Sequence, residues 1–121
     1  MFFKKKKEAD ENGNKRQYDR IDFVQASYYR IINDSQEQTA HECWFNNISV
    51  GGFSVDIPSN GIAEGDRLMV LYKIGVKMRK DRVVVRFIRK ALNNLRLGCE
   101  FVDDDIERTS LILDYIDSNL K

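Results

Sequence analysis

Six short segments of strand-forming residues, each bounded by turn signals, run through most of this chain. Valine, isoleucine, phenylalanine and tyrosine recur in them, and such residues suit a half-buried pleated surface. Turn signals such as Pro58-Ser59-Asn60-Gly61 separate one segment from the next. The segments cover residues 21–32, 39–45, 53–57, 68–74, 83–88 and 95–102. This pattern predicts a mainly β protein, a six-stranded antiparallel barrel over about residues 21–102.

The last of these segments shows the clearest alternation. From Leu95 to Phe101 the odd-numbered positions are apolar and the even-numbered ones are polar or glycine, which is the pattern of a strand with one face in the core. The inward positions are Leu95, Leu97, Cys99 and Phe101. We therefore expect this strand to close one wall of the barrel.

A change of period at the end of the chain predicts a C-terminal α-helix over about residues 104–119. Asp104 and Glu107 have the spacing of an N-cap and its N3 partner. Apolar residues then recur at three- and four-residue steps and predict one buried helical face. They are Ile106, Thr109, Leu113, Ile116 and Leu120.

The length and the charge pattern limit the class of protein. A chain of 121 residues suits one domain, and a net charge of +1 argues against a protein that coats nucleic acid. Residues 1–14 contain Lys4 to Lys7 without later apolar periodicity, so we expect a flexible basic tail. Two cysteines 56 positions apart make no disulfide scaffold, and with no secretory signal the expected location is the cytoplasm.

Catalytic and metal-binding signatures are weak. His41 is the one histidine, and no nucleophile signature accompanies it. His41, Cys43 and Cys99 lack the number and spacing of zinc ligands. The acidic run Asp103 to Asp105 is better explained as the start of the helix, where carboxylates are favoured. We therefore predict no enzyme, no metal and no cofactor.

Two polar motifs carry the ligand chemistry. The first is Arg16-x-x-x-Arg20, preceded by Lys15, just before the first predicted strand. The second is Asn47-x-Ser49-x-x-Gly52, which includes Gly51, between the second and third predicted strands. Taken alone, the first has the character of a charged tail and the second that of a turn.

Together, in this order, the motifs closely resemble those of the PilZ domain, a bacterial receptor for cyclic di-GMP. That family pairs Arg-x-x-x-Arg with a downstream (Asp/Asn)-x-Ser-x-x-Gly stretch. The strand pattern, Leu97-Gly98-Cys99-Glu100-Phe101 and the terminal helix also look like the family. The resemblance implies a PilZ domain over residues 15–121 with a motif loop at 15–20.

The resemblance also implies a ligand site. Arg16 and Arg20 would grip cyclic di-GMP from the motif loop, since an arginine fork matches both phosphate and the O6/N7 edge of guanine. The barrel side would be lined by Asn47, Ser49, Gly51 and Gly52. A basic residue at the position of Lys15 accompanies a stacked ligand pair in the family, so we expect two ligands per chain.

The implied function is that of a switched adaptor. Ligand binding would order the motif loop and change the surface offered to an effector protein. The sequence identifies neither the effector nor the process, which in the family is motility, attachment or exopolysaccharide production.

Two alternatives remain open. Residues 67–96 hold ten basic residues and one acid, Asp81, so the chain could be a small basic barrel that binds single-stranded nucleic acid. It could also be a protein-interaction module that needs no ligand. We expect neither a nucleic-acid partner, because aromatic residues do not interleave with the basic block, nor a membrane partner, because Phe2, Phe3 and Lys4 to Lys7 bury too little.

Overall fold

The computed structural model describes residues 20–32, 39–58 and 61–119 and consists of six strands followed by one helix. The elements are β1 (Ile21–Ile32), β2 (His41–Ser49), β3 (Gly52–Ile57), β4 (Arg67–Ile74), β5 (Lys77–Lys90), β6 (Leu95–Phe101) and α1 (Ile106–Asn119). The predicted fold class, a mainly β chain with a C-terminal helix, is confirmed. Residues 1–19, with Lys15, Arg16 and the basic tail, lie outside the described residues.

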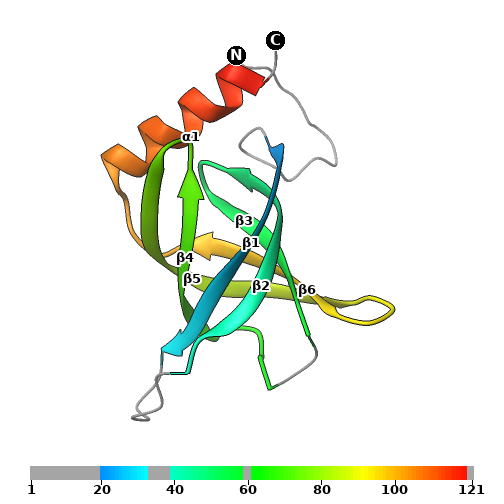
Figure 1. The fold of residues 1–121 in the computed structure, drawn as a ribbon. Coiled ribbons are helices and arrows are strands. Elements are labelled where there is room, and N and C mark those ends of the chain that lie inside the picture. The colour runs from blue at the N-terminus through cyan, green and yellow to red at the C-terminus, as the bar shows by residue number, and fades with distance from the viewer. Residues whose placement is uncertain (1–19, 33–38, 59–60, 120–121) are drawn as a thin grey trace, which may run out of the picture.

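The strands close into a barrel in the order β1-β2-β3-β6-β5-β4, and every neighbouring pair is antiparallel (Figure 1). The pairing of β1 with β4 completes the ring. Closure satisfies the backbone groups that an open sheet would leave at its edges. The six-stranded antiparallel barrel predicted from the turn pattern is therefore confirmed.

Aromatic side chains fill the centre of the barrel. The rings of Phe45 and Phe53 lie 4.6 Å apart, and Tyr72 lies 5.4 Å from Phe45. All three are at most 2% exposed. Burial of such large side chains supplies most of the driving force for folding a domain of this size.

Two strand boundaries differ from the prediction. β2 continues through Ser49, so the second motif lies partly on a strand instead of between strands. β5 begins at Lys77, which places the charged stretch 77–82 inside a strand. A two-residue turn at Gly75 and Val76 makes this possible, because Gly75 adopts φ of 61°, a conformation that favours glycine.

The helix also differs in its cap and its buried face. Asp105, not Asp104, is the N-cap, since its Oδ1 accepts the backbone N–H of Arg108 at 2.9 Å. The buried face consists of Arg108, Ile112 and Ile116. The predicted stripe was therefore wrong at Ile106, which is 90% exposed, and at Leu113, which is 52% exposed, and right at Ile116. Leu120, its last position, lies outside the described residues.

A cluster of ions joins the start of α1 to the barrel. Asp81 of β5 is 5% exposed and accepts hydrogen bonds from Tyr72 at 2.7 Å and from Arg79 at 2.7 Å. Arg108 of α1, 3% exposed, lies 3.3 Å from the same carboxylate and stacks 3.9 Å above the ring of Phe101. Burial and the bond to Asp81 raise the pKa of Tyr72.

No helix among the described residues is long and apolar enough to span a lipid bilayer.

Candidate ligand site at the β2–β3 turn

The second motif occupies the end of β2, a turn and the start of β3. Asn47 pairs across the sheet with Asp22 of β1 and with Ser54 of β3. Val50 and Gly51 form the turn, and Ser49 and Gly52 pair across it. The sequence motif is therefore one continuous hairpin end, next to the residue at which β1 begins.

A β-bulge turns two neighbouring asparagines to the same side of the strand. Phe45 pairs with Val55 and Asn47 pairs with Ser54, so β2 holds one extra residue, Asn46, between these pairs. A regular strand would turn one of the two asparagines into the core, whereas Asn46 and Asn47 are both half-buried. The bulge therefore presents a pair of amides on the outer surface.

Arg20 brings the first motif to the second. It lies directly before β1, and its Nη1 donates a hydrogen bond to Oδ1 of Asn47 at 3.3 Å. The two residues are 27 positions apart in the chain. The pairing of β1 with β2 therefore places Arg20, the last residue of the first motif, against Asn47, the first residue of the second.

Ser49 holds the turn. Its hydroxyl accepts the backbone N–H of Gly51 at 3.3 Å and donates to the carbonyl of Gly52 at 3.4 Å. The side chain is 5% exposed. This local pairing is the typical role of serine in a tight turn.

Gly52 lies against the neighbouring strand with no room for a side chain. It pairs with Glu100 of β6, and a Cβ built on it would lie 1.9 Å from the carbonyl oxygen of Cys99. This separation is far below any van der Waals contact, and the obstacle is backbone. Only glycine lets β3 and β6 approach closely here.

We expect Gly52→Ala to destabilise the protein by about 1–3 kcal/mol, because the added methyl must push β3 away from β6. Urea unfolding measures the change. The matched control is Gly61→Ala, where a Cβ would meet nothing within 4 Å, and we expect it to change stability by less than about 0.5 kcal/mol. Equal effects of the two substitutions would contradict the proposed crowding at Gly52.

Next to the motif lies a polar cluster that the sequence did not reveal. Nδ2 of Asn46 donates to Oδ1 of Asp56 at 2.9 Å, and Arg96 grips the same carboxylate through Nε at 2.8 Å and Nη2 at 3.1 Å. The hydrogen bond from Arg96 holds the pKa of Asp56 below its usual value. These residues come from three strands, and no motif spacing joins them.

A row of small residues crosses the barrel from Asn47. Ser54 pairs with Gly98 of β6, and Gly98 pairs with Phe87 of β5. A Cβ on Gly98 would lie 2.0 Å from the ring of Phe87, so the ring covers this glycine. Ser54 is 3% exposed, so both small residues are packed under their neighbours.

The two cysteines and the histidine are packed against other side chains. Cys43 and Cys99 are buried, and burial raises the pKa of each thiol to about 12, well above the range for a reactive cysteine. The ring of His41 packs 5.2 Å from the ring of Tyr29. No group of three metal-ligating side chains occurs among residues 20–32, 39–58 and 61–119.

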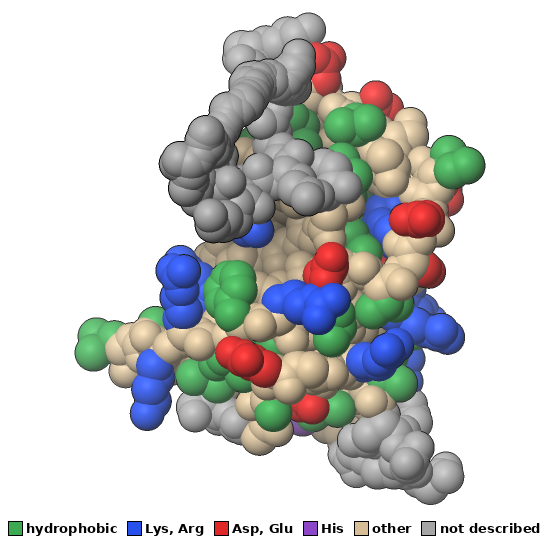
Figure 2. All heavy atoms as spheres, turned by 180° about the vertical axis from the view of Figure 1, so that it is seen from behind, with side chains coloured by type: hydrophobic (Ala, Val, Ile, Leu, Met, Phe, Trp, Pro, Cys, Tyr) green, Lys and Arg blue, Asp and Glu red, His purple; other side chains and the backbone are tan. Residues whose placement is uncertain are grey.

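Part of the basic block of residues 67–96 is neutralised by neighbouring acids. Several of its arginines are neutralised by carboxylates: Arg79 by Asp81 and Asp105, Arg86 by Glu100, and Arg96 by Asp56. Figure 2 shows one face of the molecule, on which lysine and arginine side chains are interspersed with acidic and apolar ones. Such a mixed surface does not favour tight binding of a polyanion.

A sequence model of the PilZ domain matches residues 14–118 of the chain. A search among curated proteins returned no match.

Several solved structures share the fold. The inhibitor of motility MotI/DgrA from Bacillus subtilis aligns with a TM-score of 0.67 at 21% identity, over 88% of this chain and 52% of that one. The PilZ domain of YcgR from Escherichia coli, solved with c-di-GMP, aligns with a TM-score of 0.65 at 14% identity, over 87% and 94% of the two chains. YcgR in complex with c-di-GMP gives 0.66 at 16% identity, over 86% and 45%. The chain thus spans about half the length of MotI.

Proposed function

Since this chain belongs to the PilZ domain family, we propose that it binds cyclic di-GMP at the β2–β3 turn and acts as a ligand-switched adaptor. The contact between Arg20 and Asn47 carries the proposal, because it joins the two motifs in one place on the barrel surface. The E. coli YcgR structures that share the fold were solved with this ligand, which supports the same chemistry here.

The arginines supply the affinity in this proposal. Cyclic di-GMP carries two phosphates and two guanines, and a guanidinium can bind either group through two parallel hydrogen bonds. Arg20 is exposed and is oriented by Asn47. Arg16, four positions earlier, would close on the ligand from the other side, with Lys15 adding positive charge.

The hairpin end supplies the shape. Asn47 presents an amide to the guanine edge, while Gly51 lets the ligand approach the backbone closely. Gly52 contributes by seating β3 against β6. Ser49 acts through the turn that its hydroxyl stabilises.

We expect Asn47→Asp to tighten binding by about threefold to tenfold. A carboxylate would accept charge-assisted hydrogen bonds from both Arg20 and the guanine N–H groups, and such bonds are stronger than those of a neutral amide. Isothermal titration calorimetry with cyclic di-GMP measures the change. Asn47→Ala should lower the affinity at least tenfold, and an unchanged affinity in both variants would exclude Asn47 from the site.

We further propose that each chain binds a stacked pair of ligands, with Lys15 near the second molecule. This stoichiometry rests on the basic residue before Arg16. A calorimetric ratio of two ligands per chain in the parent and of one in Lys15→Ala is the expected result. A ratio of one in the parent would contradict the stacked pair and leave the single-ligand site intact.

The adaptor role is proposed from the position of Arg20. Arg20 lies directly before β1, and this end of β1 is tied to α1, since the Tyr115 hydroxyl donates to the carbonyl of Asp22 at 3.4 Å. If a ligand orders residues 15–20 around itself, the side chains exposed beside β2 and α1 would change. An effector that prefers this closed form would respond to the second messenger.

Binding of single-stranded nucleic acid is the competing proposal. Oligonucleotide competition for cyclic di-GMP across a salt series separates the two, since phosphate-driven binding weakens steeply as salt rises. We expect a mixed-sequence oligonucleotide not to displace cyclic di-GMP at about 150 mM salt, where non-specific binding is weak.

A further inference from the structure

A second surface of the barrel combines cations and exposed apolar side chains. It consists of the outward-pointing residues of three neighbouring strands, β1, β4 and β5, which Figure 1 shows side by side. We call it the basic-apolar face. Its rows across the strands are Ile32-Arg67-Val84, Arg30-Met69-Arg82, Tyr28-Leu71-Lys80 and Lys73-Met78.

The composition of this face is that of a protein interface. Its described outward positions hold five cations and six apolar residues and no carboxylate, although Glu42 and Asp103 border it. Tyr28 is 50% exposed and Met78 is 59% exposed. Tyrosine, methionine and arginine are enriched where proteins meet.

The arrangement of the face indicates a protein partner with carboxylates. Cations and apolar side chains alternate across the sheet, and Leu71 pairs with Lys80 as Met78 pairs with Lys73. Inserting either apolar side chain into a lipid bilayer would therefore also bury the charge of the lysine beside it. Base stacking needs aromatic rings, and Tyr28 is the one aromatic among the described positions of the face. A protein surface that alternates carboxylates with apolar side chains matches both features.

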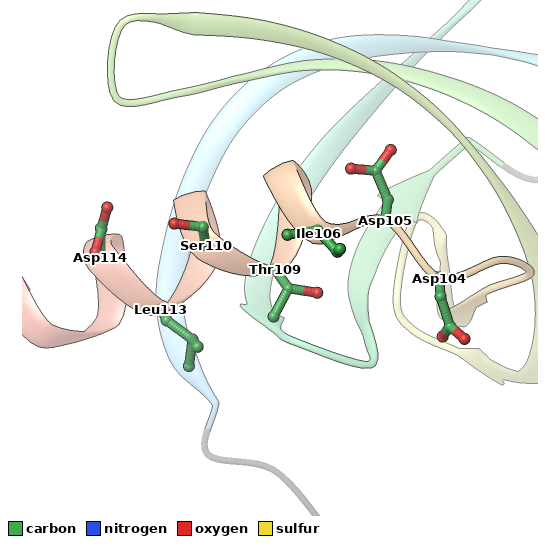
Figure 3. A pocket seen from close by; sticks show the side chains of 7 residues that line it. All are labelled: Asp104, Asp105, Ile106, Thr109, Ser110, Leu113 and Asp114. Atoms are coloured by element: carbon green, nitrogen blue, oxygen red, sulfur yellow. The ribbon is translucent and has the colours of Figure 1, made fainter.

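Helix α1 carries such a surface on its outer side. Its buried side packs through Ile112 and Ile116, while Ile106 and Leu113 remain exposed. Together with Asp104, Asp114 and their neighbours these residues line a hollow of about 440 Å³. In Figure 3, Asp104, Thr109 and Leu113 point to the same side of the helix. The last turn of the helix has no basic residue.

The two surfaces also match in length. Helix α1 has 14 residues, which span about 21 Å at 1.5 Å per residue. The rows of the basic-apolar face run from Arg67 to Lys73, about 20 Å along a strand. The helix of one chain could therefore cover all four rows.

A chain cannot bring its own helix onto its own face. Asp105 at the start of α1 is held by Arg79 of β5 at 2.8 Å, and the aromatic ring of Tyr115 lies 5.2 Å from that of Phe23. These contacts fix α1 across the end of the barrel, with its acidic side turned outward. A second copy must supply the helix.

We propose that the chain forms a dimer in which α1 of each copy lies on the basic-apolar face of the other. Two equivalent contacts would pair Asp104 and Asp114 with cations such as Lys80 and Arg82, and would cover Ile106 and Leu113. The net charge of +1 conceals this complementarity, because opposite charges are gathered on different surfaces. A chain near neutrality has little overall repulsion to oppose association.

Sedimentation equilibrium of the full chain with charge-reversed variants tests the dimer. The face variant is Lys80→Glu with Arg82→Glu, and the helix variant is Asp104→Lys with Asp114→Lys. Each should be monomeric at 14.2 kDa at concentrations where the parent is dimeric, with the dissociation constant raised at least tenfold. An equimolar mixture of the two variants should dimerise again, because both contacts then join opposite charges.

The matched control is Arg89→Glu with Lys90→Glu, two exposed positions of β5 beyond the face, which should dimerise like the parent. Near-ultraviolet circular dichroism verifies that each variant is folded. A parent that stays monomeric up to about 1 mM, the millimolar range of the weakest specific contacts, would overturn the proposal. A mixture of the two charge-reversed variants that fails to dimerise would also overturn it. The same holds for a dimer that is lost on deleting residues 1–7 but persists in the face variant.

Discussion

Replacing Arg20 by alanine is expected to lower the affinity for cyclic di-GMP at least a hundredfold, about 2.8 kcal/mol. Arg20 is the described arginine of the first motif, and Asn47 orients its guanidinium at 3.3 Å. Truncation removes a bidentate group for phosphate or guanine and leaves Asn47 without this donor. Calorimetric titration of the parent and the variant measures the loss.

Two further substitutions separate charge from geometry. Arg20→Lys keeps the positive charge but lacks the planar fork, so we expect a loss of at least tenfold. Arg16→Ala should resemble Arg20→Ala, since both arginines hold the same ligand in our proposal. Arg67→Ala, which removes an exposed arginine beside the far end of β1 from Arg20, is the matched control and should bind like the parent. Equal affinities in Arg16→Ala, Arg20→Ala and the parent would exclude the site.

Asp81→Ala is expected to destabilise the fold by about 3–5 kcal/mol, because it removes the one buried counterion of Arg108 and leaves this guanidinium only the exposed Asp103. Asp81 is the carboxylate that Arg79, Arg108 and Tyr72 share. Arg108 is 3% exposed and cannot regain water without moving α1 away from the barrel. Urea unfolding followed by circular dichroism gives the free energy of unfolding.

The control for this prediction removes a second carboxylate that pairs with Arg108. Asp103 pairs with Arg108 at 3.1 Å, but its side chain is 61% exposed. Asp103→Ala should therefore cost less than about 1 kcal/mol, the usual value for an exposed ion pair. If Asp81→Ala and Asp103→Ala were equally destabilising, burial of the ion cluster would not be the source of its contribution.

The sequence was sufficient for the architecture because strand alternation and turn residues are local signals. Leu97, Cys99 and Phe101 are buried as their spacing predicted. The pairing of β1 with β4 left no such signal, since it joins segments about forty residues apart. That closure brings Tyr28 beside the basic residues of β4 and β5, which the sequence order had kept separate.

The buried face of α1 differs from the predicted one because an arginine takes the place of apolar residues. The apolar spacing predicted Ile106 and Leu113 on the buried side, but Arg108 occupies the buried face instead. The ring of Phe101 and the carboxylate of Asp81 hold its guanidinium, and both come from the barrel. A helical pattern alone cannot reveal a buried arginine whose partners are distant in the chain.

The sequence predicted which residues belong to the candidate site but not how the strands arrange them. Asn47 and Arg20 were singled out from their motifs, and the structure brings them into contact. The bulge at Asn46 and the cluster of Asn46, Asp56 and Arg96 depend on strand register, which the sequence does not specify. The roles of Lys15 and Arg16 stay predictions, because both lie outside the described residues.

The most direct test of the account is a calorimetric titration of the full parent chain with cyclic di-GMP at about 150 mM salt, a salt concentration that screens weak, non-specific phosphate contacts. We predict saturable binding at two ligands per chain that is lost in the variant carrying both Arg16→Ala and Arg20→Ala. A parent chain that shows no binding heat and no saturation, although folded by circular dichroism, would contradict the assignment of this chain as a cyclic di-GMP receptor.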